Sequence, residues 1–267
     1  MITQNTTNPV LTLDELKEVC PVIFTETASN GVSEKYTHIP TYQVVDDMKK
    51  LGWDPVDAKQ VKARKGKGFQ KHMITFQSES LFINGEDGDD SRVQILLINS
   101  HDGKSSFRFE AGVFRLVCSN GLIVKSNDMG SFKIRHMGYT FEELQTQLNE
   151  FVANLDGVVE KMNKMITKTV SVEDARKMAK RAIDIRFGED TKMNDNMLNE
   201  ILIPTRDEDE GDSLWKVFNV VQEKIIGGGF EYKNSKGKIR KARKIKNFQQ
   251  DIKVNQQLWQ LAEEFVN

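Results

Sequence analysis

Lysine and arginine residues gather in one short stretch, and their chemistry is the clearest in the chain. Between residues 59 and 71 there are six of them and no acidic residue. They are Lys59, Lys62, Arg64, Lys65, Lys67 and Lys71. Strand-like runs lie on both sides of Lys65-Gly66-Lys67-Gly68, so the sequence predicts a cationic β-hairpin. In a chain with a net charge of only −1, this favours binding to a polyanion, above all nucleic acid. The alternative is a solvated hairpin whose lysines protect an edge strand.

A second cationic stretch follows the glycine run 227–229. From Lys233 to Lys246 the chain has eight lysines and arginines and no acidic residue. The candidate phosphate contacts among them are Lys238, Arg240, Lys241 and Arg243. The glycines predict a basic, flexible segment at 230–248 that clamps a strand or bridges to a neighbouring subunit. The alternative is a solvated loop, or one that pairs with the acidic stretch 207–212. Lysine and arginine bind phosphates without reading bases, which suits sequence-independent binding.

Two further arginines lie among aromatic residues. Arg108 is flanked by Phe107 and Phe109, and Arg115 follows Phe114. We include Arg108 and Arg115 among the candidate nucleic-acid contacts, because bases stack on exposed aromatic rings in proteins that bind single strands. The alternative, and the commoner case, is that these rings belong to the core.

No spacing in the chain matches a known catalytic or metal-binding pattern. Gly66-Lys67-Gly68 lacks the spacing of a P-loop, and the acidic run 87–90 lacks the ligand pattern of an EF-hand. The four histidines are scattered, and the two cysteines have no metal-site spacing. These residues are His38, His72, His101, His136, Cys20 and Cys118. A Cys118–histidine pair is left open, but the sequence favours a protein that is not an enzyme and uses no metal or cofactor.

The elements that position these residues follow from periodicity. A helix is predicted over 42–51, with Thr41 as its N-cap and Gly52 after its end. Three strands of an antiparallel meander follow. They cover 56–64, 70–77 and 92–98. Further strand segments reach about residue 124, and the period then changes to helical. The later helices are predicted at 141–167, 171–187, 213–226 and 254–266.

This order predicts an α+β fold, in which a β-meander packed by helices precedes a mainly helical C-terminal half. We divide the chain into a sheet domain, 1–135, and a helical region, 136–267, which includes the basic segment 230–248. Hydrophobic residues make up 38% of the 267 residues and charged residues 29%, as in a globular, water-exposed protein. The first residues do not resemble a signal peptide, and no run is long enough to span a bilayer. We therefore expect a cytoplasmic location, in a bacterial host cell, and no membrane partner.

Two motifs resemble a phage- and plasmid-like family of unknown function. The run from Phe109 to Leu122 contains the pattern R-x-V-C-x-N-G, from Arg115 to Gly121. The run from Trp215 to Glu223 resembles the tryptophan–asparagine helix of that family, and Asn255-Gln256-Gln257-Leu258-Trp259 fits its closing segment. The resemblance covers most of the chain and implies an origin in a phage or mobile element, but it implies no activity.

A second resemblance, unlike the first, implies a function. The order of a helix, Gly52-Trp53 and a basic strand meander is similar to the core of the Rad-fifty-two class of single-strand annealing proteins. In that class, the sheet and hairpin line a positively charged groove on an oligomeric ring. The lysines and arginines of the class do not map one by one onto this chain. The resemblance therefore implies nucleic-acid binding more directly than annealing.

Together these observations predict a nucleic-acid-binding protein of a phage or mobile element. It would bind single-stranded DNA and anneal it during recombination, as a homo-oligomer that forms a ring, without a cofactor. The alternative is a protein-interaction or inhibitor module directed at a host factor, in which the basic segments dock on an acidic protein.

Overall fold

A computed structural model describes most of the chain. The described residues are 9–32, 36–62, 68–83, 91–103, 105–115, 121–123, 132–135 and 139–266, of which 82, 83, 114, 115 and 121–123 are described by their backbone alone. The residues fall into two compact units. The sheet unit comprises Met1–Leu122 and Met129–Asn154, and the helical unit comprises Ile123–Asp128 and Leu155–Asn267.

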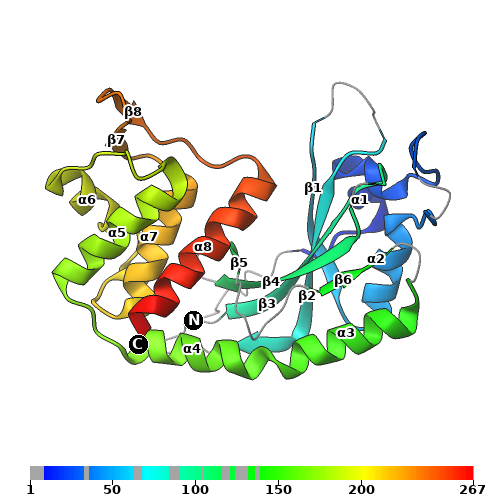
Figure 1. Cartoon of the computed structure of the whole chain (residues 1–267). Helices are drawn as coiled ribbons and strands as arrows, with labels where there is room; N and C mark the ends of the chain where they lie inside the picture. Colours follow the sequence, from blue (N-terminus) through cyan, green and yellow to red (C-terminus); the bar gives the residue numbers. More distant parts are fainter. Residues whose placement is uncertain are drawn as a thin grey trace. The chain divides into compact units, whose positions relative to one another are not determined.

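The sheet unit is built on an antiparallel meander, which confirms the predicted α+β class (Figure 1). Its strands run in the order β1-β2-β3-β4-β5, and β6 pairs with β4. Their bounds are β1 Asp54–Gln60, β2 His72–Ile83, β3 Ser91–Asn99, β4 Phe107–Arg115, β5 Gly121–Ile123 and β6 Phe132–Ile134. All nine residues of β3 are buried, as its nearly continuous apolar run predicts.

Short helices complete the sheet unit. They are α1 Leu13–Val19, η1 Pro21–Phe24, α2 Thr41–Lys50 and α3 Phe141–Ala153. Helices α1 and α2 pack beside β1. Gly52 follows α2 with a φ of 81°, a conformation that favours glycine. Trp53 is then 3% exposed and meets the ring of Phe151 on α3 edge-on, with 6.2 Å between centroids. The Gly-Trp pair therefore links α2, the sheet and α3.

Thr41 does not have the predicted role of a helix cap. It is the first residue of α2, Pro40 stands at the cap position, and no side chain caps the helix. Thr41 is fully buried, and its hydroxyl faces histidines and an asparagine instead. A threonine before a helix predicts a cap only when no stronger long-range contact competes for its hydroxyl.

The helical unit contains the remaining helices and one β-hairpin. The helices are α4 Leu155–Thr167, α5 Val172–Phe187, α6 Asp195–Ile201, η4 Asp207–Asp209, α7 Leu214–Gly227 and α8 Phe248–Val266. The hairpin consists of β7 Glu231–Lys233 and β8 Ile239–Lys241. The single helix expected at 141–167 is instead two helices, α3 and α4, which end and begin around Asn154. Asparagine and the nearby Gly157 are weak helix formers.

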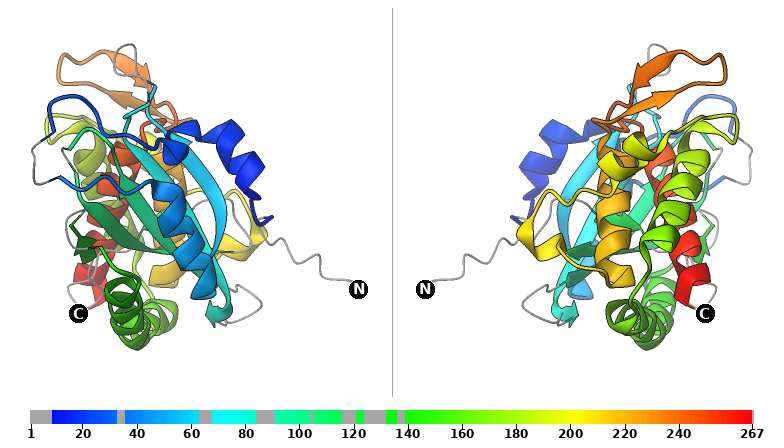
Figure 2. Two further views of the ribbon diagram at one scale, coloured as in Figure 1. Left: turned by 90° about the vertical axis from the view of Figure 1, so that its right-hand side faces the viewer. Right: turned by 90° about the vertical axis from the view of Figure 1, so that its left-hand side faces the viewer.

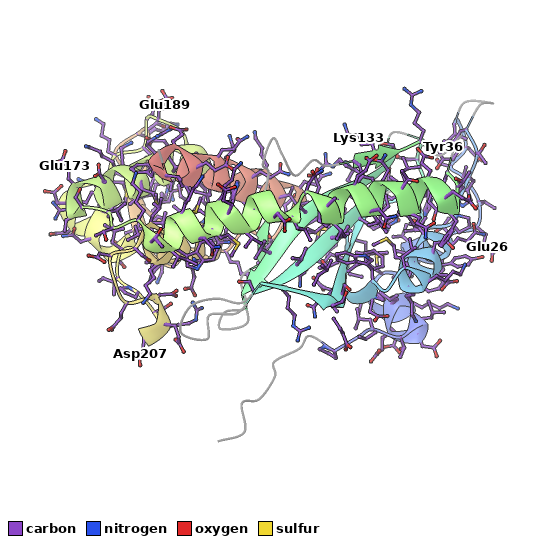
Figure 3. The ribbon with its side chains drawn as sticks, turned by 90° about the horizontal axis from the view of Figure 1, so that it is seen from below. Glu26, Tyr36, Lys133, Glu173, Glu189 and Asp207 are labelled. Atoms are coloured by element: carbon purple, nitrogen blue, oxygen red, sulfur yellow. The ribbon has the colours of Figure 1, made fainter. Side chains whose placement is uncertain are left out.

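Aromatic residues of α7 and α8 form the core of the helical unit. Phe218 lies 6.1 Å from both Trp215 and Trp259, measured between ring centroids. Two buried amides pair between the helices, because Gln222 Nε2 donates to Asn255 Oδ1 at 2.8 Å. Labelled carboxylates such as Glu173 and Glu189, by contrast, point outward from the unit (Figure 3).

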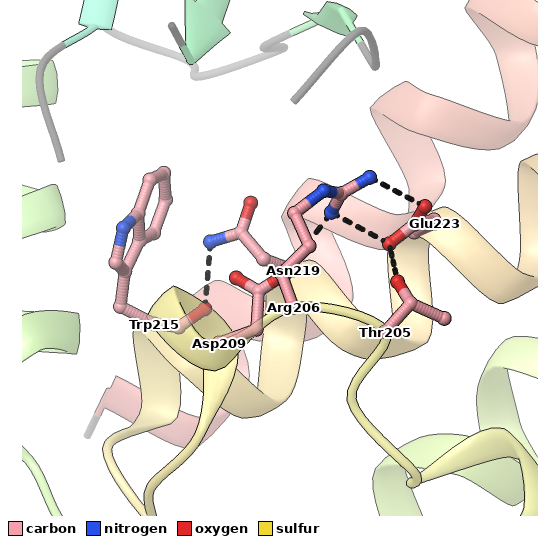
Figure 4. Close-up of polar contacts among 6 residues, drawn as sticks. All are labelled: Thr205, Arg206, Asp209, Trp215, Asn219 and Glu223. Atoms are coloured by element: carbon pink, nitrogen blue, oxygen red, sulfur yellow. Dashed lines mark hydrogen bonds and ion pairs between the residues drawn. The ribbon is translucent and has the colours of Figure 1, made fainter. Parts of the chain in front are cut away.

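A cluster of charged residues links the segment before α7 to Glu223 on that helix (Figure 4). The Arg206 guanidinium donates to both carboxylate oxygens of Glu223, at 2.6 and 2.8 Å. It also donates to Asp209 at 3.1 Å, and the Asp209 side chain is fully buried. The acidic stretch 207–212 was one predicted partner for the basic segment. Its buried residue, Asp209, instead pairs with Arg206.

The Arg206→Ala substitution tests this cluster. It removes a cation from a fully buried carboxylate, so we expect the free energy of unfolding to fall by roughly 3 kcal/mol, measured by urea denaturation. The control is Lys164→Ala, which breaks an exposed i,i+4 pair with Glu160 and should cost about 0.5 kcal/mol. Equal losses in the two variants would contradict the structural role of Arg206.

Candidate nucleic-acid interface

The register between β1 and β2 decides which way the first basic stretch faces. Gln60 pairs with His72, and the Val61 N–H donates to the Lys71 carbonyl at 2.9 Å. Because side chains alternate along a strand, Gln60 and Lys62 share one face with Gln70 and His72. Lys59 and Lys71 lie on the opposite face. The six cations of this stretch are therefore not a single ridge.

The three cations of this stretch that the structure describes differ in their surroundings. Lys62 is exposed, whereas Lys59 forms an ion pair with Asp57 at 2.6 Å. Lys71 is half-buried. Arg64, Lys65 and Lys67 lie outside the described residues. Of the described members, Lys62 is thus the cation most available to a phosphate.

A pocket of about 420 Å³ lies between η1 and this end of the hairpin. It is lined by Pro21, Val22, Thr25, Gln60, Lys62, Gly68 and Gln70. The side-chain oxygen of Gln70 accepts from the Gly68 N–H at 2.6 Å, and the Thr25 hydroxyl donates to the Gly68 carbonyl at 2.7 Å. These bonds hold the returning strand against η1 and give the pocket a fixed wall.

Three histidines, distant in the sequence, lie together in the fold. The His101 ring is 4.8 Å from that of His38 and 5.2 Å from that of His72, between centroids. Two of them support residues of the pocket. His72 Nδ1 donates to the Gln70 carbonyl at 3.0 Å, and His38 Nε2 donates to the Thr25 carbonyl at 2.8 Å. Sequence spacing did not indicate this cluster, because only the tertiary fold brings the three histidines together.

The Thr41 hydroxyl is the centre of this polar cluster. It lies 2.8 Å from His72 Nε2 and 3.3 Å from His101 Nε2, and it accepts from Asn99 Nδ2 at 3.0 Å. His72 Nδ1 must carry a hydrogen, since a carbonyl can only accept. In neutral His72, Nε2 then accepts from Thr41, whose oxygen accepts from Asn99 and His101. The hydroxyl thereby uses its one donor and two acceptor positions.

The β7–β8 hairpin carries the second basic stretch and projects from the helices of its own unit (Figures 1 and 2). Tyr232 pairs with Arg240, and Lys233 pairs with Ile239. Seven cations of the hairpin and the chain after it are exposed. They are Lys236, Lys238, Arg240, Lys241, Arg243, Lys244 and Lys246. Within the described part of the chain, none of the seven takes part in an ion pair.

Several contacts tie the base of this hairpin to the helices of its own unit, and two short strands, β7 and β8, lie within the segment 230–248. Gly228 approaches the chain at Ala242 so closely that a Cβ would lie 2.7 Å from the Ala242 carbonyl oxygen. Arg186 donates to the carbonyls of Ile225 and Arg243. Burial lowers the pKa of this guanidinium from its ordinary value. Tyr232 stacks on Phe187 with 4.2 Å between centroids.

The arginines among aromatic residues have a different setting. Arg108 is partly exposed and forms an ion pair with Glu110 at 2.9 Å, so a carboxylate offsets its charge. Phe107 and Phe109 are buried, which confirms the core alternative for these two rings. The side chains of Phe114 and Arg115 lie outside the description, as do residues 116–120 of the R-x-V-C-x-N-G motif.

The described residues contain no group of three His, Cys, Asp or Glu side chains placed to hold a metal ion. Cys20 is fully buried, and burial, with a smaller contribution from Asp57, raises the pKa of its thiol to about 12. The thiolate is the nucleophilic form, so Cys20 is unsuited to nucleophilic catalysis at neutral pH. Cys118 and His136 lie outside the described side chains. No helix of the described chain combines the length and hydropathy needed to cross a membrane.

Residues 29–259 match the family described as "Domain of unknown function (DUF932)". The chain belongs to this family. Two relatives from Escherichia coli (strain K12) are UPF0380 protein YafZ and UPF0380 protein YfjQ. Each is 33% identical over 255 residues, which cover 95% of this chain and 90% of the relative. No solved structure matches the chain. The motifs at Trp215, Asn219 and Trp259 that resembled a family of unknown function lie in the core of the helical unit, where Asn219 Nδ2 donates to the Trp215 carbonyl at 2.7 Å (Figure 4).

The Thr41→Val substitution tests the polar cluster. It keeps the shape of the side chain and removes the hydroxyl shared by His72, His101 and Asn99. We expect the free energy of unfolding to fall by about 1–3 kcal/mol, measured by urea denaturation, because buried polar groups lose a partner.

The matched control is Thr146→Val on α3. Thr146 is exposed, and its hydroxyl donates to the Glu142 carbonyl in the same helix. That variant should stay within about 0.5 kcal/mol of the wild type. If both variants lose the same stability, the buried cluster has no special role in holding α2 to the sheet.

Proposed function

We propose that this protein binds single-stranded nucleic acid, DNA in particular, and anneals complementary strands. It would do so during recombination of a phage or mobile element, as a homo-oligomer without a cofactor, in the cytoplasm of the bacterial host. The observation that carries the proposal is the β7–β8 hairpin with the chain after it, where seven cations are exposed and form no ion pair with described residues.

The phosphodiester groups of a nucleic-acid strand are suitable partners for this exposed cationic surface. Exposed lysines and arginines displace the counterions of a nucleic-acid strand, and this release supplies most of the affinity of sequence-independent binding. The hairpin also exposes an apolar side chain among its cations, since Ile239 is 56% exposed. Tyr232, half-buried and paired with Arg240, adds a ring near the charge. Bases of a single strand provide faces for such contacts, whereas the bases of a duplex are stacked inside it.

The proposed mechanism needs only binding. Cations hold one strand by its phosphates, and the bases remain open to a complementary strand. The chain order of α2, Gly52-Trp53 and the meander supports this reading, because it is similar to the core of the single-strand annealing class. An oligomer would extend the cationic surface over many nucleotides and increase the affinity through multivalency.

Charge reversal at the hairpin tests the proposal. We expect the Lys238→Glu/Arg240→Glu/Lys241→Glu variant to bind a labelled single strand of about 30 nucleotides at least tenfold more weakly, by fluorescence anisotropy. The slope of log K against log salt should fall by about 2, because each lost phosphate contact contributes about 0.7 for a single strand.

The control reverses three exposed lysines on helices, in Lys17→Glu/Lys164→Glu/Lys177→Glu. It changes the net charge by the same amount, so it separates the hairpin from the overall field. The wild type should also speed the annealing of complementary strands. Absence of wild-type binding at low salt would contradict the proposal and favour a protein-interaction module; equal losses in the two variants would exclude the hairpin as the binding surface.

A further inference from the structure

Among the described residues, the lining of the pocket beside η1 offers hydrogen-bond donors and contains no carboxylate. Gln60 Oε1 accepts from the Val22 N–H at 3.3 Å, and Gln70 Oε1 accepts from the Gly68 N–H at 2.6 Å. A backbone N–H can only donate, so the atom that faces it is in each case the amide oxygen. The NH₂ group of each glutamine is therefore the remaining arm, and it can only donate.

The other two polar side chains of the lining differ in polarity. The Thr25 hydroxyl donates its hydrogen to the Gly68 carbonyl, so it can offer the pocket only acceptor positions. Lys62, on the same face of the hairpin as Gln60, brings an ammonium group, which has three donors and no acceptor. None of the seven described lining residues is acidic. Lys62 and the two glutamine NH₂ groups therefore favour a ligand that supplies hydrogen-bond acceptors and a negative charge.

The size and the apolar wall narrow the class of ligand further. A volume of about 420 Å³ exceeds what a phosphate alone would fill and is typical of small-molecule sites. Pro21 and Val22 give one wall an apolar surface against which a planar ring can lie. A nucleotide combines these features, since it joins a phosphate to a flat base with carbonyl acceptors.

We propose that this pocket binds one nucleotide unit with a carbonyl-bearing base, such as thymine. The Lys62 ammonium contacts the phosphate, and the NH₂ groups of Gln60 and Gln70 donate to carbonyl oxygens of the base. The unit belongs either to a bound strand, in which case the inference rests on the proposed function, or to a free mononucleotide of the same chemistry. The histidine cluster keeps the pocket in shape without a ligand, because His72 and His38 hold the Gln70 and Thr25 carbonyls. A preformed site loses less entropy on binding.

The Gln60→Glu/Gln70→Glu variant tests this directly. Glutamate keeps the oxygen that accepts from the Val22 and Gly68 N–H groups but turns the donating arm into an acceptor. Binding of thymidine monophosphate, measured by calorimetry, should weaken by at least about tenfold. The preference of the protein for an oligo-dT over an oligo-dA strand should also fall. The bases of oligo-dA stack on one another and so affect its affinity. This effect is the same for every variant, so it cancels when the ratio of the two affinities is compared between variants.

Two further variants complete the design. Gln43→Glu/Gln260→Glu adds the same charges at exposed positions and should keep both affinities. Lys62→Met should remove the advantage of thymidine monophosphate over thymidine, and it leaves the glutamine bonds intact. Circular dichroism and urea denaturation confirm that each variant is folded.

The outcomes separate this inference from the proposed function. Wild-type binding of strands with no binding of thymidine monophosphate, and an unchanged dT preference in the glutamate variant, would overturn the pocket and leave the function standing. Binding of thymidine monophosphate without binding of any strand would support the pocket and overturn the function. The hairpin variant at Lys238, Arg240 and Lys241 should lose strand affinity and keep the mononucleotide.

Discussion

The antiparallel register of β1 and β2 is the constraint on which the sheet unit and its pocket depend. Pairing of Gln60 with His72 puts Gln60, Lys62 and Gln70 on one face, beside η1. A shift by one residue would turn them to the other face. The β2–β3 register pairs His72 with Asn99 and so brings His72 close to His101, and His72 also contacts Thr41 on α2. Two strand pairings thus fix the pocket and the polar cluster that holds α2.

The β7–β8 hairpin in the helical unit is also positioned by a few specific contacts. They hold its base, and most of its cations lie outside them. The close approach at Gly228, the bonds from Arg186 and the stack of Tyr232 on Phe187 define where the hairpin starts. Beyond them its lysines and arginines are in solvent. Like charges on a short ribbon repel one another, and a polyanion relieves that repulsion.

Local patterns predicted much of the fold. The meander, the burial of β3 and the helices near 171–187 and 213–226 follow from periodicity and caps that act within a few residues. The histidine cluster and the role of Thr41 could not be predicted, because they depend on contacts between residues far apart in the chain, up to the 63 positions between His38 and His101. Gln60 and Gln70 could not be predicted as site residues for a related reason. Only their bonds from the Val22 and Gly68 N–H groups show that each NH₂ group points elsewhere. Lysine-rich composition indicated both basic stretches, and strand alternation already predicted opposite faces for Lys59 and Lys62. Only the structure shows that Lys62 lines a pocket and that Lys59 pairs with Asp57.

The proposed function requires that single-stranded nucleic acid binds along the cationic β7–β8 hairpin. The most direct measurement is photo-crosslinking of the wild-type protein to a strand that contains 4-thiothymidine, followed by peptide mapping by mass spectrometry. We predict crosslinks in peptides from 230–246, and further ones in peptides that contain Gln60, Lys62 or Gln70. Crosslinks confined to the outer surfaces of helices such as α1 and α5, with none in the hairpin, would contradict the account.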